Sequence, residues 1–273
     1  MFSVYQAIVL GIVQGLTEFL PVSSSAHLIL VPWLLKWQED PGLAFDVVLH
    51  LGTLLALLIF YWREWLEMVM SLANGNRVQR RLLLLLIVAS VPGAIIGVLL
   101  EKQAETTFRS PVLIACTLAT LGVLLWAADA IGSKKRKLGD LTLIDAVLIG
   151  LSQALAIIPG VSRSGATITT ARILGIERAD AANFSFLMAT PIIAGAGLME
   201  ARKFFHSGLT PQLGWGFAAS AVFGLIAIVW LLSYVRNHSY RPFAIYRIAL
   251  AALVVAVALA RDRKSTRLNS SHT

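Results

Sequence analysis

Charged residues and cysteine are both scarce in this chain of 273 residues. Only 14% of the residues are charged, whereas 57% are hydrophobic, against about 45–50% in ordinary soluble domains. The single cysteine, Cys116, excludes an intrachain disulfide and, because it lies in an apolar run, does not indicate a thiol site. No basic stretch precedes the first apolar run, so we expect no cleaved signal peptide.

Long apolar runs dominate the rest of the sequence. The mean hydropathy is +0.76, and one bilayer span needs about 20 predominantly apolar residues. We therefore predict an all-α polytopic membrane protein, with six transmembrane helices and two helical hairpins that re-enter the membrane without crossing it. The formal charge of +8 then reports topology and does not indicate nucleic-acid binding. The predicted spans are residues 47–62, 82–100, 112–131, 181–199, 213–235 and 242–260, with a basic loop over 63–81.

One polar stretch, QGLTEFLPVSSSAH at residues 14–27, interrupts the apolar pattern near the N-terminus. Gln14 and Glu18 are four residues apart and share one face of a helix. Pro21 ends that helix, and a second helix carrying His27 in its first turn follows. Backbone broken in this way inside a membrane must be surrounded by protein or by a water-filled cavity. Three consecutive serines are candidate N-caps of the second helix: Ser23, Ser24 and Ser25.

A second polar stretch, IPGVSRSGAT at residues 158–167, indicates an internal repeat. Each half of the chain then contains one re-entrant hairpin followed by three spans, in the same order. An odd number of crossings inverts the second copy, which is the architecture of inverted-repeat transporters with broken helices. With a shift of 139 positions, Ala7, Gly11, Gln14, Leu16, Val22, Ser23 and Ser25 coincide with Ala146, Gly150, Gln153, Leu155, Val161, Ser162 and Ser164.

The predicted organisation has four parts: a first repeat at 1–132, a basic linker at 133–140, a second, inverted repeat at 141–260, and a polar, disordered tail at 261–273. Basic residues are more numerous on the side of the linker, and this side is expected to be cytoplasmic, so both termini are expected outside. The richer side carries Arg63, Arg77, Arg80, Arg81, Lys134, Lys135, Arg136, Lys137, Arg172, Arg178, Arg236 and Arg241.

Inverted repeats bring the two polar stretches toward one cavity, where Arg163 could face Glu18, Ser24 and His27. These groups suit phosphoryl transfer, which needs a nucleophile, a proton carrier and positive charge for the phosphate oxygens. Glu18 could also hold a divalent cation that bridges phosphates. A purely structural ion pair of Glu18 with Arg163 is disfavoured, because an intramembrane charge costs about 2.5–3.5 kcal/mol. Arg247 is interpreted as snorkelling or pairing within the bundle.

Two motifs resemble the signatures of the bacterial undecaprenyl-diphosphate phosphatases of the BacA/UppP type. The first is Gln14-x-x-x-Glu18 followed by PVSSSAH at 21–27, and the second is PGVSRSGAT at 159–167. The resemblance covers residues 1–260. It implies hydrolysis of undecaprenyl diphosphate to undecaprenyl phosphate and inorganic phosphate, which recycles the carrier for peptidoglycan, supports cell shape and confers bacitracin resistance.

The resemblance further implies an inner-membrane enzyme with a lipid diphosphate substrate, a site open to the periplasm, and a divalent cation, Mg²⁺ or Ca²⁺. Carried over by position, Glu18 would hold the metal. The first position of the same motif is Gln14, whose neutral side chain adds no charge to a metal site. A homo-oligomer is compatible with the sequence. The implied catalytic residues are Glu18, Ser24, His27 and Arg163, and those near the phosphates are Arg163, Ser162, Ser164, Thr167, Ser23 and Gln14.

The nucleophile stays open at this point. Ser24 fits best, with His27 or Glu18 taking its proton, but direct attack by His27 or by water is compatible with the residues. Two other protein classes could use the same polar loops. A secondary transporter or lipid flippase would need no nucleophile, and an intramembrane protease would cleave peptides and leave Arg163 without a role.

Overall fold

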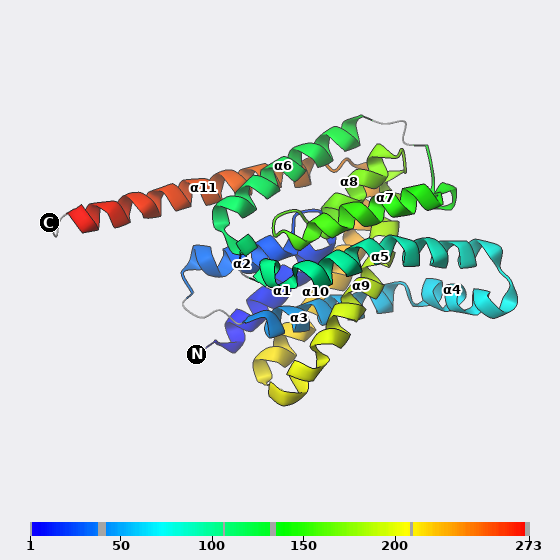
Figure 1. Cartoon of the computed structure of the whole chain (residues 1–273), viewed down its shortest axis with the longest axis horizontal. Coiled ribbons are helices and arrows are strands. Elements are labelled where there is room, and N and C mark those ends of the chain that lie inside the picture. The colour runs from blue at the N-terminus through cyan, green and yellow to red at the C-terminus, as the bar shows by residue number, and fades with distance from the viewer. Residues whose placement is uncertain (1, 38–41, 106, 132–134, 208–209, 271–273) are drawn as a thin grey trace.

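The computed structural model describes residues 2–37, 42–105, 107–131, 135–207 and 210–270, and these are helical throughout most of their length (Figure 1). The all-α prediction is confirmed. The long helices are α3 (Gly42–Phe60), α5 (Arg77–Glu105), α6 (Pro111–Ala130), α9 (Arg178–Ser207), α10 (Pro211–Asn237) and α11 (Arg241–Ser270). The shorter ones are α1 (Val4–Phe19), α2 (Ser24–Leu35), α4 (Trp62–Asn74), α7 (Leu143–Ala154) and α8 (Arg163–Ile173), with short 3₁₀ turns η1 (Thr107–Arg109), η2 (Leu138–Asp140) and η3 (Leu155–Ile157).

Five of the six predicted spans, those after residue 81, coincide with long apolar helices. Five described helices, α5, α6, α9, α10 and α11, are long and apolar enough to cross a bilayer. The number rises to six if α3 and α4, which meet at an angle of 72°, are counted as one bent span. The chain is therefore a multi-pass membrane protein.

Local sequence explains where the re-entrant helices begin and end. The Ser3 side chain caps α1 by accepting from the Gln6 amide, and Thr142 caps α7 by accepting from the Asp145 amide. Leu20 leaves α1 in an extended conformation because Pro21 follows it. Both α1 and α7 are shorter than a full span, as expected of helices that stop inside the membrane.

The two halves pack in corresponding ways. Helix α1 lies against α10 and α7 lies against α5, while α3 contacts α9 and α6 contacts α11. Glycines allow the close approach: a Cβ on Gly11 would lie 2.4 Å from the Gly216 carbonyl oxygen of α10, and one on Gly150 would lie 2.4 Å from the Ala89 carbonyl oxygen of α5. Gly11 and Gly150 are themselves 139 positions apart. This correspondence supports the predicted repeat.

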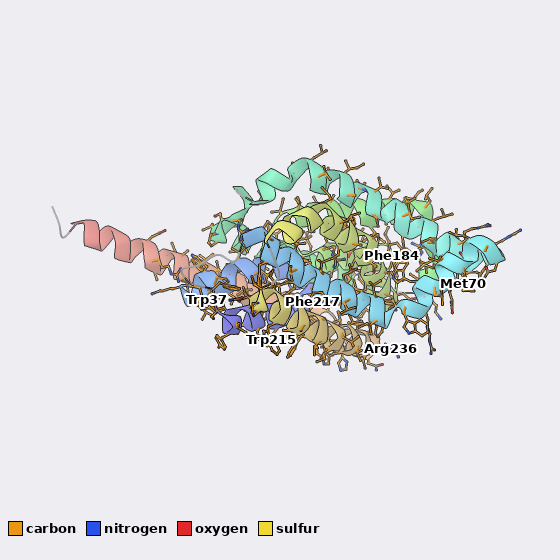
Figure 2. The ribbon with its side chains drawn as sticks, turned by 90° about the horizontal axis from the view of Figure 1, so that it is seen from below. Trp37, Met70, Phe184, Trp215, Phe217 and Arg236 are labelled. Atoms are coloured by element: carbon orange, nitrogen blue, oxygen red, sulfur yellow. The ribbon has the colours of Figure 1, made fainter. Side chains whose placement is uncertain are left out.

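The two ends of the bundle differ in their side chains. Figure 2 shows Trp37 and Trp215 near one end, and Met70 and Arg236 near the other. The start of α1 and the end of α11 lie toward one side in Figure 1, and α4 lies toward the other. Six crossings, with α3 and α4 counted as one bent span, would place the start of α1 and the end of α11 on one side, as in Figure 1.

Two expectations about connecting segments need correction. The predicted loop over 63–81 is mostly helix, because residues 62–74 form the amphipathic helix α4, which stops at Gly75 in a left-handed conformation (φ 74°) before α5 begins. The tail expected to be disordered over 261–273 continues α11 as far as Ser270, since its leucine, arginine and lysine residues are good helix formers. Residues 132–134 of the linker region and 271–273 lie outside the described residues.

Candidate active site

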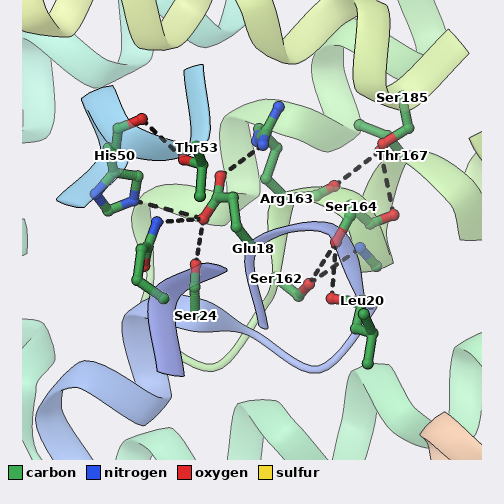
Figure 3. Close-up of polar contacts among 12 residues, drawn as sticks. Glu18, Leu20, Ser24, His50, Thr53, Ser162, Arg163, Ser164, Thr167 and Ser185 are labelled. Carbon is green, nitrogen blue, oxygen red and sulfur yellow. Dashed lines mark hydrogen bonds and ion pairs between the residues drawn. The ribbon is translucent and has the colours of Figure 1, made fainter. Parts of the chain in front are cut away.

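Glu18, in the last turn of α1, is the centre of the polar cluster (Figure 3). Its Oε1 accepts a hydrogen bond from Arg163 Nη2 at 2.6 Å. Its Oε2 accepts from Ser24 Oγ at 2.5 Å and from Gln14 Nε2 at 3.0 Å. Because the Glu18 side chain is only 5% exposed, its charge is balanced chiefly by these neighbours. The predicted meeting of Glu18, Ser24 and Arg163 is therefore present in the structure.

Arg163 opens α8 and faces Glu18 with one arm of its guanidinium group. The other arm, Nη1, is buried and has no hydrogen-bond partner among the described residues. A buried guanidinium nitrogen without a partner is costly, so it calls for a ligand that this structure does not contain. Its planar fork suits phosphate oxygens.

His50 is a site residue that the sequence reasoning did not single out. Its Nε2 lies 3.6 Å from Glu18 Oε2, and its Nδ1–H donates to the Asp46 carbonyl oxygen at 2.7 Å. It lies inside α3, and its side chain is 30% exposed. The signal available in the sequence was an ionisable side chain within an apolar span.

Of the two residues predicted to take the Ser24 proton, His27 or Glu18, the hydrogen bonds of the described residues join Ser24 to Glu18 and not to His27. Its Nδ1–H donates to the Ser23 carbonyl oxygen at 2.7 Å, and its Nε2 accepts from the Tyr246 hydroxyl at 2.7 Å. The ring also stacks on Tyr246. The imidazole therefore folds back on the start of its own helix and ties α2 to α11, while the hydroxyl of Ser24 turns to Glu18.

Three hydroxyl groups predicted to lie around the phosphates are used within the protein. Ser162 Oγ caps α8 by accepting from the Gly165 amide at 3.0 Å. Ser164 Oγ donates to the Leu20 carbonyl oxygen at 3.1 Å, and Thr167 Oγ1 donates to the Arg163 carbonyl oxygen at 2.8 Å. All three residues are buried. In this structure they shape and brace the second loop.

The two loops are also bonded to each other. Ser23, predicted to bind phosphate, accepts from the Gly160 amide at 3.1 Å and is buried. Arg247 of α11 is fully buried and donates to carbonyl oxygens of both loops and of α6. Of the two interpretations of Arg247, pairing within the bundle is confirmed and snorkelling is excluded, because its guanidinium is buried and bonded inside the protein. The acceptors are the carbonyl oxygens of Pro21, Leu118, Gly160 and Val161.

The donor set around Glu18 fits a divalent cation held largely by substrate. Within the described chain, no three histidine, cysteine or acidic side chains cluster as a complete metal site. Glu18 supplies one carboxylate, and the nearby Gln14 Oε1 is buried without a described hydrogen-bond partner. Mg²⁺ commonly binds through one or two carboxylates together with phosphate oxygens.

Comparison with known proteins identifies the family. The family description "Bacitracin resistance protein BacA" matches residues 7–253, nearly the whole chain. The chain belongs to the BacA family. A BacA-like relative from Moorella thermoacetica, named undecaprenyl-diphosphatase, is 56% identical over 256 residues, covering 93% of this chain and 98% of that protein. Another of the same name, from Gemmatimonas aurantiaca, is 51% identical over 267 residues, covering 95% and 99%. The resemblance of the two polar motifs to this family is confirmed.

Proposed function

We propose that this protein is a membrane phosphatase that hydrolyses undecaprenyl diphosphate to undecaprenyl phosphate and inorganic phosphate. The observation that carries the proposal is the contact of Ser24 with Glu18, which in turn binds Arg163. Hydroxyl, carboxylate and guanidinium converge at the meeting point of two broken helices inside a membrane protein. Relatives that match nearly all of this chain carry the name of this activity.

In the proposed reaction, Ser24 Oγ attacks the terminal phosphorus of the diphosphate while its proton passes to Glu18 Oε2, 2.5 Å away. The anhydride P–O bond breaks, the lipid monophosphate leaves with the proton that Glu18 had accepted, and the terminal phosphoryl group stays on the serine. Water then attacks this phosphoserine and gives a proton to the ionised Glu18, which passes it to the leaving Ser24 Oγ as inorganic phosphate is released. Ser24 and Glu18 return to their starting protonation states after one turnover.

Arg163 is proposed to bind the oxygens of the transferred phosphoryl group through Nη1, while Nη2 keeps its bond to Glu18. Glu18 and Gln14 Oε1 would hold the divalent cation, Mg²⁺ or Ca²⁺, which neutralises negative charge on the diphosphate when bound. His27 keeps α2 in place through Ser23 and Tyr246 and thereby positions Ser24. This assigns His27 a positioning role.

Phosphate release tests the proposal directly. Purified protein in detergent micelles, supplied with undecaprenyl diphosphate and Mg²⁺, should release inorganic phosphate catalytically although no second compartment exists. A transporter or flippase would bind the lipid without releasing phosphate. Absence of release from a well-folded protein would contradict the proposed enzyme.

We also propose that the protein resides in the bacterial cytoplasmic membrane with its site open to the outside and the basic end of the bundle in the cytoplasm. Single cysteines can be placed in a Cys116→Ala background. Gly139→Cys should resist an impermeant thiol reagent in intact cells, whereas Lys203→Cys should react. The reverse pattern would invert the proposed orientation.

A further inference from the structure

A second polar cavity lies at the basic end of the bundle. It has a volume of about 260 Å³ and is lined by Arg172, Glu177, Arg178, Ala179, Val235 and Arg236. Arg172 follows Arg163 by nine positions on α8, which places it about 14 Å further along that helix. The cavity is therefore separate from the cluster around Glu18.

Arg172 is the strongest indication that this cavity takes an anion. Its side chain is fully buried, and its Nε donates to Asp129 Oδ1 at 3.1 Å while Nη1 donates to the Ile176 carbonyl oxygen. Its Nη2 is buried with no hydrogen-bond partner among the described residues. A buried charged donor without a partner costs free energy, and an anionic ligand in the cavity would satisfy it.

Charge in and around the cavity is positive on balance. Asp129 is shared, because Arg178 also donates to it, through Nε at 2.8 Å and through Nη2 at 3.0 Å. Asp129 further accepts from the Tyr240 amide at 3.0 Å. With Arg236 exposed at the last turn of α10, three guanidinium groups stand against two carboxylates, those of Asp129 and Glu177. Arg178 also begins α9, so the positive end of that helix dipole lies at the cavity, with Asp180 in the same first turn.

An apolar groove lies on α10, on the turns that precede Arg236. It has a volume of about 450 Å³ and is lined by Leu225, Ile226, Val229, Trp230 and Ser233. Residues 226, 229, 233 and 236 follow helical spacing, so the groove and Arg236 share one face of α10. Figure 2 shows Trp215 and Arg236 toward opposite ends of α10. Arginine at the end of a spanning helix is expected at the level of the lipid head groups.

We propose that the cavity binds the phosphate head group of an anionic lipid, with one acyl or prenyl chain lying in the groove along α10. Arg172, Arg178 and Arg236 supply charged donors that match phosphate oxygens. The apolar wall of the groove contacts the hydrocarbon. A lipid is favoured over free phosphate because the apolar groove lies on the same face of α10 as Arg236, which lines the cavity. This proposal does not depend on the proposed enzymatic activity.

Native mass spectrometry with two probe lipids tests this assignment. The wild-type protein in detergent should retain dioleoyl phosphatidic acid in preference to dioleoyl phosphatidylcholine, whose head group carries a compensating positive charge. Arg236→Gln should lower retention of phosphatidic acid about tenfold, the expected effect of losing one charged hydrogen bond. Arg236 is exposed, so this variant should keep its fold, which thermal melting can verify.

The matched control is Arg77→Gln, which removes an equally exposed arginine from the start of α5, away from the cavity. It should retain phosphatidic acid like the wild type, so the difference between the two variants excludes binding at the Glu18 cluster. Equal retention by both variants would overturn the proposal. Thermal stabilisation by inorganic phosphate that requires Arg236, without retention of phosphatidic acid, would overturn the lipid assignment.

Discussion

The loop that joins α1 to α2 and the loop that enters α8 share a strained serine before the returning helix but differ in their chemistry. Each places a serine at positive φ just before its returning helix, Ser23 at 76° and Ser162 at 69°. Each of these hydroxyls meets the hydroxyl two residues later, Ser25 at 3.3 Å and Ser164 at 3.2 Å. A non-glycine residue at positive φ is strained, and it persists here because both loops are bonded to each other and to Arg247.

The side chains that differ between the loops are those that form the site. At the shift of 139 positions, Ser24 corresponds to Arg163 and Glu18 corresponds to Ile157. The first loop therefore carries a hydroxyl and a carboxylate, and the second carries the guanidinium. Two identical copies would place two carboxylates together without a cation for the phosphates. Divergence at these two positions converts a repeated structural element into one composite site.

The largest expected effect comes from removing the hydroxyl that only the first loop has. Ser24→Ala should lower phosphate release by on the order of 10³-fold or more, as expected for loss of an activated nucleophile. Ser25→Ala is the matched control and should lower phosphate release far less, because the Ser25 hydroxyl contacts Ser23 and does not contact Glu18 among the described hydrogen bonds. Single-turnover phosphate release from each purified variant, with folding checked by thermal melting, measures both effects.

This experiment also separates the candidate nucleophiles. His27→Gln should displace α2 and thereby weaken activity indirectly. We therefore expect a smaller loss of activity than with Ser24→Ala. A nearly inactive His27→Gln beside a substantially active Ser24→Ala would move the nucleophile to His27 or to water.

The next largest effect should come from the residue that only the second loop has. Arg163→Lys retains the charge but not the fork that binds Glu18 through Nη2 and leaves Nη1 for a phosphate. We expect kcat/KM to fall by on the order of 10²-fold, since one transition-state donor is worth about that much. Turnover like that of the wild type by a folded Arg163→Lys protein would remove Arg163 from the proposed mechanism.

A third experiment concerns the residue that joins the loops. Arg247→Met would leave carbonyl oxygens of both loops without their donor, so the protein should lose about 2 kcal/mol or more of stability. Thermal melting in detergent should show a lower midpoint than that of the wild type. Arg241→Met, which removes an exposed arginine near the start of the same helix, is the control. Equal midpoints for both variants would show that the loops hold together without Arg247.

The smallest expected effect tests the metal. Gln14→Glu adds a second carboxylate beside Glu18, so the Mg²⁺ concentration for half-maximal activity should fall by about tenfold or less. Titration of Mg²⁺ into metal-stripped protein, with phosphate release as the readout, measures the change. Direct Mg²⁺ binding by calorimetry provides a readout that does not require activity. An unchanged or higher requirement by both methods would place the cation away from Gln14.

The sequence alone determined the all-α membrane fold and the residues that carry charge into it. Long apolar runs require spanning helices. Glu18 and Arg163 lie inside such runs, and the free energy of an unpaired charge there is so unfavourable that each residue needs a partner. The two polar motifs located both loops, because each combines a proline with hydroxyl and charged residues. Proline alone would not have been enough, since Pro32, Pro92 and Pro191 lie inside helices. These inferences depend only on residue types and their order along the chain, which the sequence contains.

Only the tertiary structure decided how His27, His50 and Arg247 are used. His27 turns away from Ser24 because Tyr246, 219 positions later, supplies a hydroxyl at 2.7 Å. His50 reaches Glu18 because α3 packs beside α1. Arg247 points inward because two loops from opposite halves of the chain bring their carbonyl oxygens to one place. Side-chain direction at such positions depends on helices far apart in sequence, and periodicity within one helix carries no information about it.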